Sequence, residues 1–273
     1  MTWALRGLAA FGAFLVLLAV SVAVATGPIV PGVSAAPASS SPAPTTAAPS
    51  GSPETTVVDN SPRPLPTASS SPVPSATFIP VEERPRAVFL GDSITRGATD
   101  PALGVVDEFS WFYGLIDDSM GVVRWGGTVA EIGMTSGWMA EQADNALSLS
   151  PDILIVLGGT NDITGPVTPD DVIANLESIK VKADAYGIRL AVCTVPPRSD
   201  PEVDARAVAL NAALKVWAPA NGIILLDTAR DLRAPGGGWK PGYSGDGVHP
   251  TPEAARLMSA AAAETLRSIS LGS

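Results

Sequence analysis

The sequence predicts an α/β protein whose folded part has three layers, with a parallel sheet of five strands between two layers of helices. From Pro85 onward, short apolar runs alternate with amphipathic stretches, which is the pattern of strands and helices in turn. The apolar runs are continuous, which is typical of parallel strands buried on both faces. Two of the amphipathic stretches also begin with helix-capping signals.

The predicted strands span residues 87–90, 122–124, 153–157, 189–195 and 223–226. The predicted helices span residues 108–119, 137–149, 169–186, 203–217 and 252–268. Thr168-Pro169-Asp170 and Thr251-Pro252-Glu253 each place a capping hydroxyl before a proline and an acid, and Gly187 supplies a stop. In an open sheet of this kind, ligands bind beyond the carboxyl ends of the strands, so functional residues are expected there.

Composition divides the 273-residue chain into three parts. Residues 1–26 contain Arg6 as their only charge, followed by an apolar run over residues 8–25. This run predicts a signal peptide or an N-terminal membrane anchor, because Ala23-Val24-Ala25 offers a cleavage site while the length just suffices to span a bilayer. In either case the positive-inside rule places the rest outside the cytoplasm, secreted or anchored to the outer face of the cytoplasmic membrane.

Residues 27–82 are predicted to be a disordered linker and residues 83–273 the folded domain. Residues 27–80 hold half of the chain's 26 prolines, with dense Ser, Thr and Ala, and Phe78 is their only aromatic residue. Such a stretch cannot bury enough apolar surface to offset the entropy of ordering. It is typical of a spacer that holds a domain away from a membrane or cell wall, or that only separates two segments.

Composition also excludes several classes of function. A net charge of −10 argues against nucleic acid as a partner, since binding phosphates needs a basic face. One histidine and one cysteine cannot supply a zinc shell, and we expect neither a metal site nor a cofactor. Cys193 has no partner for a disulfide within the chain and is interpreted as a small buried hydrophobic residue. We expect a monomer whose partner is a small-molecule or glycan ester, with membrane contact only through an uncleaved N-terminal segment.

The only histidine, His249, is the one side chain suited to exchange a proton near neutral pH. Asp246 precedes it by three residues and would fix its tautomer if the two side chains meet. A lone histidine is more often a satisfied surface or core residue, and this spacing is common by chance. A catalytic role therefore depends on a nucleophile in a suitable setting elsewhere.

Candidate partners for His249 follow the predicted strands. Ser93 lies in a glycine-flanked turn after the first strand, where it is either an exposed nucleophile or only a helix cap. Asn161 follows two glycines after the third strand and can direct an amide N–H at a developing oxyanion, although the same residues suit a polar turn. Glycines at 126, 127, 133 and 137 follow the second strand and compete to supply a backbone donor, of which we select Gly133.

Taken in order, these motifs resemble those of the SGNH, or GDSL, hydrolase superfamily. The resemblance covers about residues 85–268 and rests on Gly91–Gly97, Gly158–Asp162 and Asp246–Pro250. The segment after the second strand matches less closely, because family members usually show a shorter Gly-x-Ser-Gly-like segment there. The resemblance implies a flavodoxin-like three-layer fold and ester hydrolysis.

The resemblance also implies a role for each residue. Ser93 would be the nucleophile and give its own N–H to the oxyanion hole, His249 the general base, and Asp246 the carboxylate that orients it. The Gly133 N–H and the Asn161 side chain would complete the hole. Independently, acyl transfer needs an activated hydroxyl, a proton shuttle and two or three donors for the tetrahedral intermediate, and the sequence offers each once.

We therefore expect an extracytoplasmic serine esterase that hydrolyses carboxylic esters of short acyl groups such as acetyl, through an acyl-Ser93 intermediate. The same acyl-enzyme would serve an O-acyltransferase acting on an envelope glycan, and a non-catalytic surface glycan-binding module is a third hypothesis. Trp239 and Tyr243 either line the substrate pocket or only pack their loop down. Arg96 either meets an anionic substrate group or is solvated.

Overall fold

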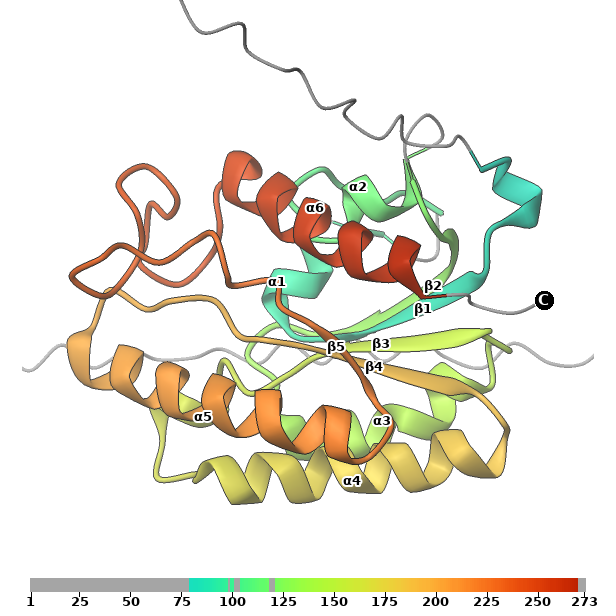
Figure 1. Cartoon of the computed structure of the whole chain (residues 1–273), viewed down its shortest axis with the longest axis horizontal. Helices are drawn as coiled ribbons and strands as arrows, with labels where there is room; N and C mark the ends of the chain where they lie inside the picture. The colour runs from blue at the N-terminus through green and yellow to red at the C-terminus, as the bar shows by residue number, and fades with distance from the viewer. Residues whose placement is uncertain (1–78, 98, 101–103, 118–120, 270–273) are drawn as a thin grey trace, which may run out of the picture. The chain divides into compact units, whose positions relative to one another are not determined.

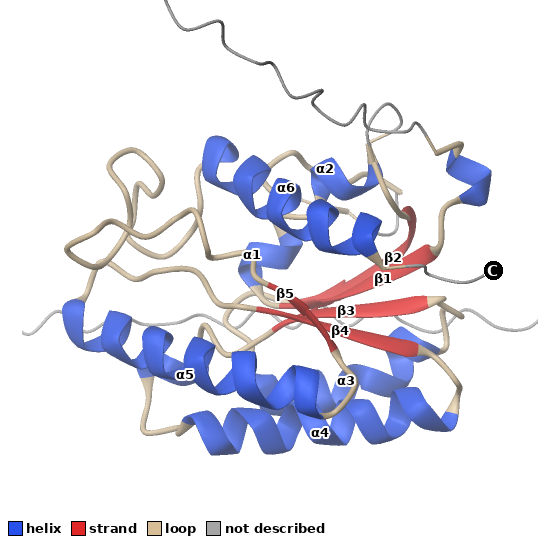
Figure 2. Ribbon diagram, in the orientation of Figure 1, coloured by secondary structure: helices blue, strands red, loops and turns tan. Residues whose placement is uncertain are grey.

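A parallel sheet of five strands, in the order β2-β1-β3-β4-β5, forms the centre of the folded part (Figures 1 and 2). The computed structural model describes residues 79–97, 99–100, 104–117 and 121–269. Its strands are β1 (Arg86–Gly91), β2 (Arg124–Ala130), β3 (Ile153–Leu157), β4 (Arg189–Cys193) and β5 (Ile224–Leu226). The predicted α/β class with five parallel strands is confirmed.

The predicted N-terminal segment at residues 1–26, and the predicted linker up to residue 78, lie outside the described residues. Within the described ranges, no helix is both long and apolar enough to cross a membrane.

Helices cover both faces of the sheet, as Figure 1 shows. The α-helices are α1 (Ser93–Arg96), α2 (Tyr113–Ile116), α3 (Ser136–Leu147), α4 (Pro169–Ala185), α5 (Pro201–Ala220) and α6 (Pro252–Ser268). Two short 3₁₀ helices, η1 (Val81–Glu83) and η2 (Asp162–Thr164), complete the elements of the described ranges. One face of the sheet packs against α3, α4 and α5, and the other packs against α2 and α6.

Alternation along the strands explains why both faces are apolar, since successive strand residues point to opposite sides. In β1, Val88 and Leu90 pack toward α3, α4 and α5, whereas Phe89 packs toward α2 and α6. No residue of β3 is more than 1 % exposed. The continuous apolar runs of the sequence therefore correspond to strands buried on both faces.

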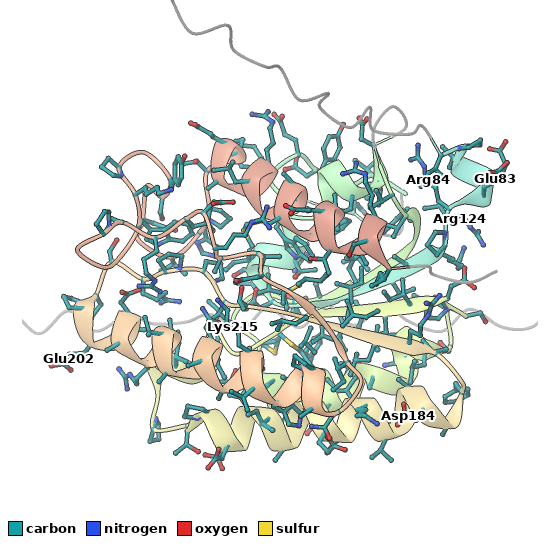
Figure 3. The ribbon with its side chains drawn as sticks, viewed as in Figure 1. Glu83, Arg84, Arg124, Asp184, Glu202 and Lys215 are labelled. Atoms are coloured by element: carbon teal, nitrogen blue, oxygen red, sulfur yellow. The ribbon has the colours of Figure 1, made fainter. Side chains whose placement is uncertain are left out.

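The helix starts agree with the capping signals in the sequence. The Thr168 side chain accepts from the Asp171 N–H while the Asp171 carboxylate accepts from the Thr168 N–H, which completes a capping box at the start of α4. At the start of α6, the Thr251 side chain accepts the Ala254 N–H. At the start of α5, the Asp200 side chain accepts hydrogen bonds from two backbone N–H groups. The negative charge of Glu202 in the first turn (Figure 3) interacts favourably with the helix dipole. Gly187 takes a φ of +67° directly after α4, as a stop requires.

The second strand differs from the prediction of residues 122–124. It runs over Arg124–Ala130 and contains Gly126 and Gly127, which the sequence had placed in the following loop. Glycine is disfavoured in strands, but here it lets the backbone of β2 approach that of β1 closely. A Cβ on Gly126 would lie 2.8 Å from the Ala87 carbonyl oxygen of β1. The extent of this edge strand is therefore determined by backbone pairing with β1, and not by the pattern of its side chains.

The predicted helix at residues 108–119 is also wrong in extent, since only Tyr113–Ile116 is helical among the residues described from 108 to 117. Side-chain bonds hold the preceding residues in turns: the Ser110 hydroxyl donates to the Arg96 carbonyl, and the Trp111 indole N–H donates to Thr95 Oγ1. Trp111 is nevertheless fully buried. It belongs to the core, as the sequence indicated, but in a turn and not in a helix.

Candidate active site

Ser93 begins α1 directly after β1, at the carboxyl edge of the sheet. Asp92, and not Ser93, caps this helix by accepting the Ile94 N–H at 2.9 Å. The turn is tight enough to need glycine at position 91, because a Cβ there would lie 2.2 Å from Thr95 Oγ1. Ser93 is partly exposed, and as the first residue of a helix its N–H is one of those without an acceptor inside the helix.

The His249 side chain contacts Ser93, although the two residues are 156 apart in sequence. Its Nε2 lies 2.8 Å from Ser93 Oγ, and its Nδ1 lies 2.7 Å from Asp246 Oδ2. The other oxygen of Asp246 accepts the backbone N–H groups of Val248 and His249, each at 2.8 Å. The structure therefore brings the three predicted residues into one hydrogen-bonded chain from hydroxyl to imidazole to carboxylate.

The Asp246 carboxylate is held in its ionised form. Partial burial on its own would raise the pKa of Asp246, but hydrogen bonds from the His249 ring and from the two backbone N–H groups outweigh it. The resulting pKa lies well below the ordinary value of 3.8. An ionised carboxylate at Nδ1 places the imidazole proton there, which leaves Nε2 able to accept a proton from Ser93.

A second carboxyl group lies beside Ser93, in an environment that the sequence alone did not reveal. Asp92 is fully buried. Burial raises the pKa of Asp92 from 3.8 to about 7, although the Ile94 N–H and the charge of His249 act in the opposite direction.

Asn161 lies on the neighbouring loop, after β3. Its Nδ2 donates to the Met134 carbonyl at 2.9 Å and lies 3.5 Å from Asp92 Oδ2. The second contact is at the limit for a hydrogen bond, so a substrate oxygen can compete for that proton. The side-chain amide is thus held between the loop after β2 and the nucleophile turn.

Gly133 lies in the loop between β2 and α3, next to Met134. It takes a φ of +77°, and nothing lies within 4 Å of where its Cβ would be. Of the four competing glycines, Gly126 and Gly127 belong to β2 and Gly137 to α3, which leaves Gly133 as the one in the connecting loop.

Arg96 joins this loop to the nucleophile helix. Its guanidinium pairs with Glu131 at 2.5 Å, and the same Glu131 oxygen accepts the Ile132 N–H. The Arg96 side chain is 38 % exposed, which agrees with its interpretation as a solvated residue, and its charge is paired with Glu131 at the surface.

The loops after β2 and β3 make a contact that was not predicted from the sequence. Asp162, in the loop of Asn161, accepts both the backbone N–H and the hydroxyl of Ser136, at 2.9 Å and 2.6 Å. Asn175 on α4 donates to the same hydroxyl. Asp162 thereby fixes the start of α3 relative to Asn161. Because Asp162 and Ser136 are 26 residues apart in sequence, only the fold reveals their contact.

The loop that carries Asp246 and His249 is packed down by its aromatic residues. Trp239 and Tyr243 lie against the core shared by the sheet and α6. The indole N–H of Trp239 donates to the Gly247 carbonyl at 3.2 Å, inside the catalytic motif. Packing of the loop is therefore the role that the structure shows for Trp239.

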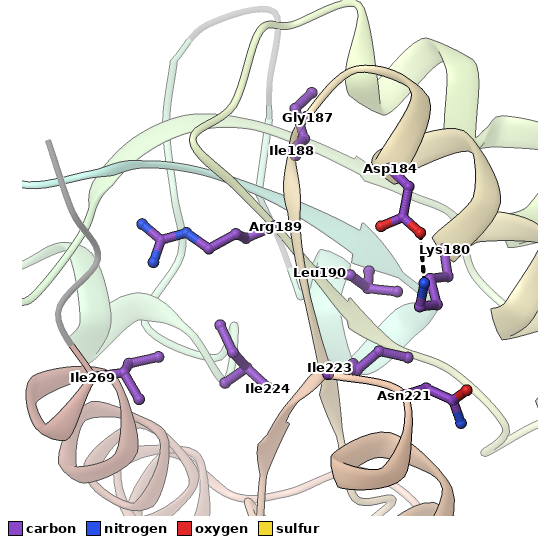
Figure 4. A pocket seen from close by; sticks show the side chains of 11 residues that line it. Lys180, Asp184, Gly187, Ile188, Arg189, Leu190, Asn221, Ile223, Ile224 and Ile269 are labelled. Carbon is purple, nitrogen blue, oxygen red and sulfur yellow. Dashed lines mark hydrogen bonds and ion pairs between the residues drawn. The ribbon is translucent and has the colours of Figure 1, made fainter.

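Two other features are separate from these residues. Figure 4 shows a pocket of about 450 Å³ at the opposite edge of the sheet, where β4 and β5 begin, with the Lys180–Asp184 ion pair on its wall. Cys193 is buried, and burial raises the pKa of its thiol well above the usual range, which agrees with its interpretation as a small hydrophobic residue.

A serine hydroxyl bonded to an imidazole that is bonded to a carboxylate, placed beyond the carboxyl ends of a parallel sheet, defines a serine hydrolase. The chain belongs to the GDSL-like lipase/acylhydrolase family, which its residues 89–257 match, and so is an SGNH-type hydrolase that acts on ester bonds. The resemblance seen in the sequence is confirmed. No curated protein sequence is similar enough to be identified as a relative.

Solved structures share the fold. A GDSL-like lipase from Bacteroides thetaiotaomicron is 24 % identical with a TM-score of 0.56, over 69 % of this chain and 91 % of the lipase. An acetylxylan esterase from Geobacillus stearothermophilus is 16 % identical with a TM-score of 0.55, over 70 % of this chain and 96 % of the esterase. The three-layer SGNH fold predicted from the sequence is thus confirmed.

Proposed function

We propose that this protein is an extracytoplasmic esterase that removes short acyl groups, such as acetyl, from glycan or small-molecule esters through an acyl-Ser93 intermediate. The observation that carries the proposal is the pair of contacts of His249, at 2.8 Å to Ser93 Oγ and 2.7 Å to Asp246 Oδ2. Both ring nitrogens are thereby engaged, one with the nucleophile and one with the orienting carboxylate.

The chemistry proceeds in two halves. In acylation, Ser93 Oγ attacks the ester carbonyl while His249 Nε2 takes the hydroxyl proton; the proton then goes to the leaving alcohol as the ester C–O bond breaks. In deacylation, His249 takes a proton from water as the water oxygen attacks the acyl carbonyl; the bond from the acyl carbon to Ser93 Oγ then breaks, His249 returns the proton to Ser93, and the carboxylic acid leaves. Asp246 stays ionised and stabilises the imidazolium in both halves.

The developing oxyanion would be bound by three donors. They are the backbone N–H groups of Ser93 and Gly133 and the side-chain amide of Asn161. The proton of Asn161 that faces Asp92 at 3.5 Å is the one available for this purpose, because the other is held by the Met134 carbonyl at 2.9 Å. Loss of one such donor typically lowers kcat by about 100- to 1,000-fold.

Exposure of the site supports an ester of a bulky alcohol. The side chains of His249 and Asp246 are 46 % and 56 % exposed, so a large leaving group can extend into solvent. The acetylxylan esterase of the same fold is consistent with such a substrate class. The export segment predicted at residues 1–26 supports action outside the cytoplasm, where envelope or environmental glycans are accessible.

The test is hydrolysis of 4-nitrophenyl acetate by the parent chain and by Ser93→Ala and His249→Ala. Both variants should lose at least about 100-fold in kcat while keeping the parent's Tm, because each removes a group required in the transition state. Ser178→Ala removes an exposed serine of α4 and is the matched control. Undiminished turnover by folded Ser93→Ala would reject the proposal.

An acyl-chain series and acetylated polysaccharides then test the substrate class, and transfer to an added glycan in excess of hydrolysis would reject hydrolysis as the main reaction.

A further inference from the structure

A segment after β4 contacts both loops that carry the proposed catalytic groups. Arg198 and Ser199 lie between the Asn161 loop and the His249 loop. We propose that Arg198 is a positioning residue, which sets the Asn161 loop against the loop of Asp246 and His249 and places a fixed positive charge beside the site. This inference deepens the proposed function and rests on it.

The first contact is to the Asn161 loop. Arg198 Nη1 donates to the carbonyl oxygen of Thr160 at 3.2 Å, one residue before Asn161. Arg198 is only 9 % exposed, so this bond lies in a region largely shielded from water. A charged donor to a carbonyl in such a setting is stronger than a neutral one and limits how far the Asn161 loop can move.

The second contact is to the histidine loop. The Ser199 N–H donates to the Gly247 carbonyl at 3.0 Å, between Asp246 and His249. Gly247 takes a φ of +80°, and a Cβ on it would lie 2.6 Å from the Ser199 side chain. The two segments are therefore in close contact at the residue that separates the acid from the base.

Asp204 on α5 holds this segment at its base. It is 6 % exposed, and its Oδ1 accepts the Arg198 backbone N–H at 2.9 Å. Its other oxygen accepts the Gly238 N–H at 2.9 Å and pairs with Arg233, both in the histidine loop. Since α5 is a long helix packed on the sheet, Arg198 is fixed to the rigid part of the fold.

The charge of Arg198 also acts on the site. Its guanidinium interacts favourably with the charges of Asp92, Asp246 and Asp200. Asp92 and Asp246 in turn face His249. A fixed cation near these carboxylates favours their ionised forms, so its removal should move the acid limb of the kcat/KM profile to higher pH.

The experiment compares Arg198→Met and Arg198→Lys in the full chain with a soluble aryl acetate. Arg198→Met should lower kcat by about 100-fold with little change in KM, and should move the acid limb to higher pH, because it removes both the bond and the charge. Arg198→Lys keeps the charge, and should restore the position of the acid limb and part of kcat. The matched control is Arg86→Met, because Arg86 also donates to backbone carbonyls, those of Leu149 and Gly126, but at the start of β1, away from the site.

Two results would overturn the inference. One is an Arg198→Met protein with kcat within about threefold of the parent and an unmoved acid limb. The other, used if Arg198→Met does not fold, is an Arg198→Lys protein whose acid limb moves to higher pH. Lysine retains the positive charge, so this result would show that the charge at position 198 does not set the acid limb. Either result leaves the proposed function standing if Ser93→Ala is inactive, whereas an active Ser93→Ala rejects the proposed function itself.

Discussion

Asp92 is a buried carboxyl group directly beside the nucleophile, and burial raises its pKa from 3.8 to about 7. The folded state binds this proton more tightly than the unfolded chain, so the group's contribution to stability is lost as pH rises from about 4 to about 7. Asp92→Asn removes the titration. Across this window, the free energy of unfolding of the parent should fall relative to that of the variant, by about 1.4 kcal/mol for each unit of raised pKa. Urea unfolding of both proteins at several pH values measures this, and parallel curves would contradict the raised pKa.

Asp246 has the opposite shift, because the hydrogen bonds it accepts outweigh its partial burial and lower its pKa. It stays charged through the working range, so Asp246 itself should add no step to the acid limb of the kcat/KM profile. Asp246→Asn should lower kcat by up to about 10⁴-fold and move that limb to lower pH, since the imidazolium loses its partner. A pH series on an aryl acetate measures both effects; an unmoved limb with kcat within tenfold would show that Asp246 is not the partner.

The residues of the site differ in how far sequence could predict them. Ser93, Asn161 and His249 each lie in a short motif beside a predicted strand or helix, and the structure brings them together at the sheet edge. Arg198 stands in no such motif. Its contact with Thr160 spans 38 residues and depends on the β3 and β4 loops being neighbours, which only the folded sheet determines.

At the scale of elements, the contact between η2 and α3 couples two loops of the site. Asp162 accepts two hydrogen bonds from Ser136 in a buried position. Asp162→Ala should therefore lower the free energy of unfolding by about 1–3 kcal/mol and also lower kcat, because the Gly133 loop precedes α3 directly. Thr168→Ala removes the cap of α4, away from the site, and should lower stability by about 1 kcal/mol with kcat unchanged. Thermal unfolding and kcat of both variants test this; equal kcat in the two would contradict the coupling.

Elements defined by side-chain pattern were predicted closely, and those defined by tertiary contacts were not. The structure places β3 and α6 at the predicted residues, because continuous burial and a Thr-Pro cap are local signals. The strand β2 was predicted too early, since its two glycines pair through the backbone with β1. The helix expected at residues 108–119 is shortened by the bond from Trp111 to Thr95, which lies on another element.

The order of strands in the sheet explains why one edge of the sheet holds the site. The strand order β2-β1-β3 places β1 between the strands on either side, so the loops after β1, β2 and β3 converge. Ser93, Gly133 and Asn161 come from these three loops. The triad is completed from the segment before α6, which packs on the opposite sheet face from α3, α4 and α5.

The whole-chain prediction concerns where the reaction takes place. The apolar run at residues 8–25 and the proline-rich stretch after it lead us to propose a hydrolase domain outside the cytoplasmic membrane. When the full chain is produced in bacterial cells, protease added to cells with a permeable envelope but an intact cytoplasmic membrane should degrade the domain and abolish its esterase activity, while a cytoplasmic marker survives. Mass spectrometry of the N-terminus then separates the two forms, because a signal peptide leaves a chain beginning after Ala25 and an anchor leaves residues 1–26 attached. Activity that remains protected together with the marker would place the enzyme in the cytoplasm and contradict the prediction.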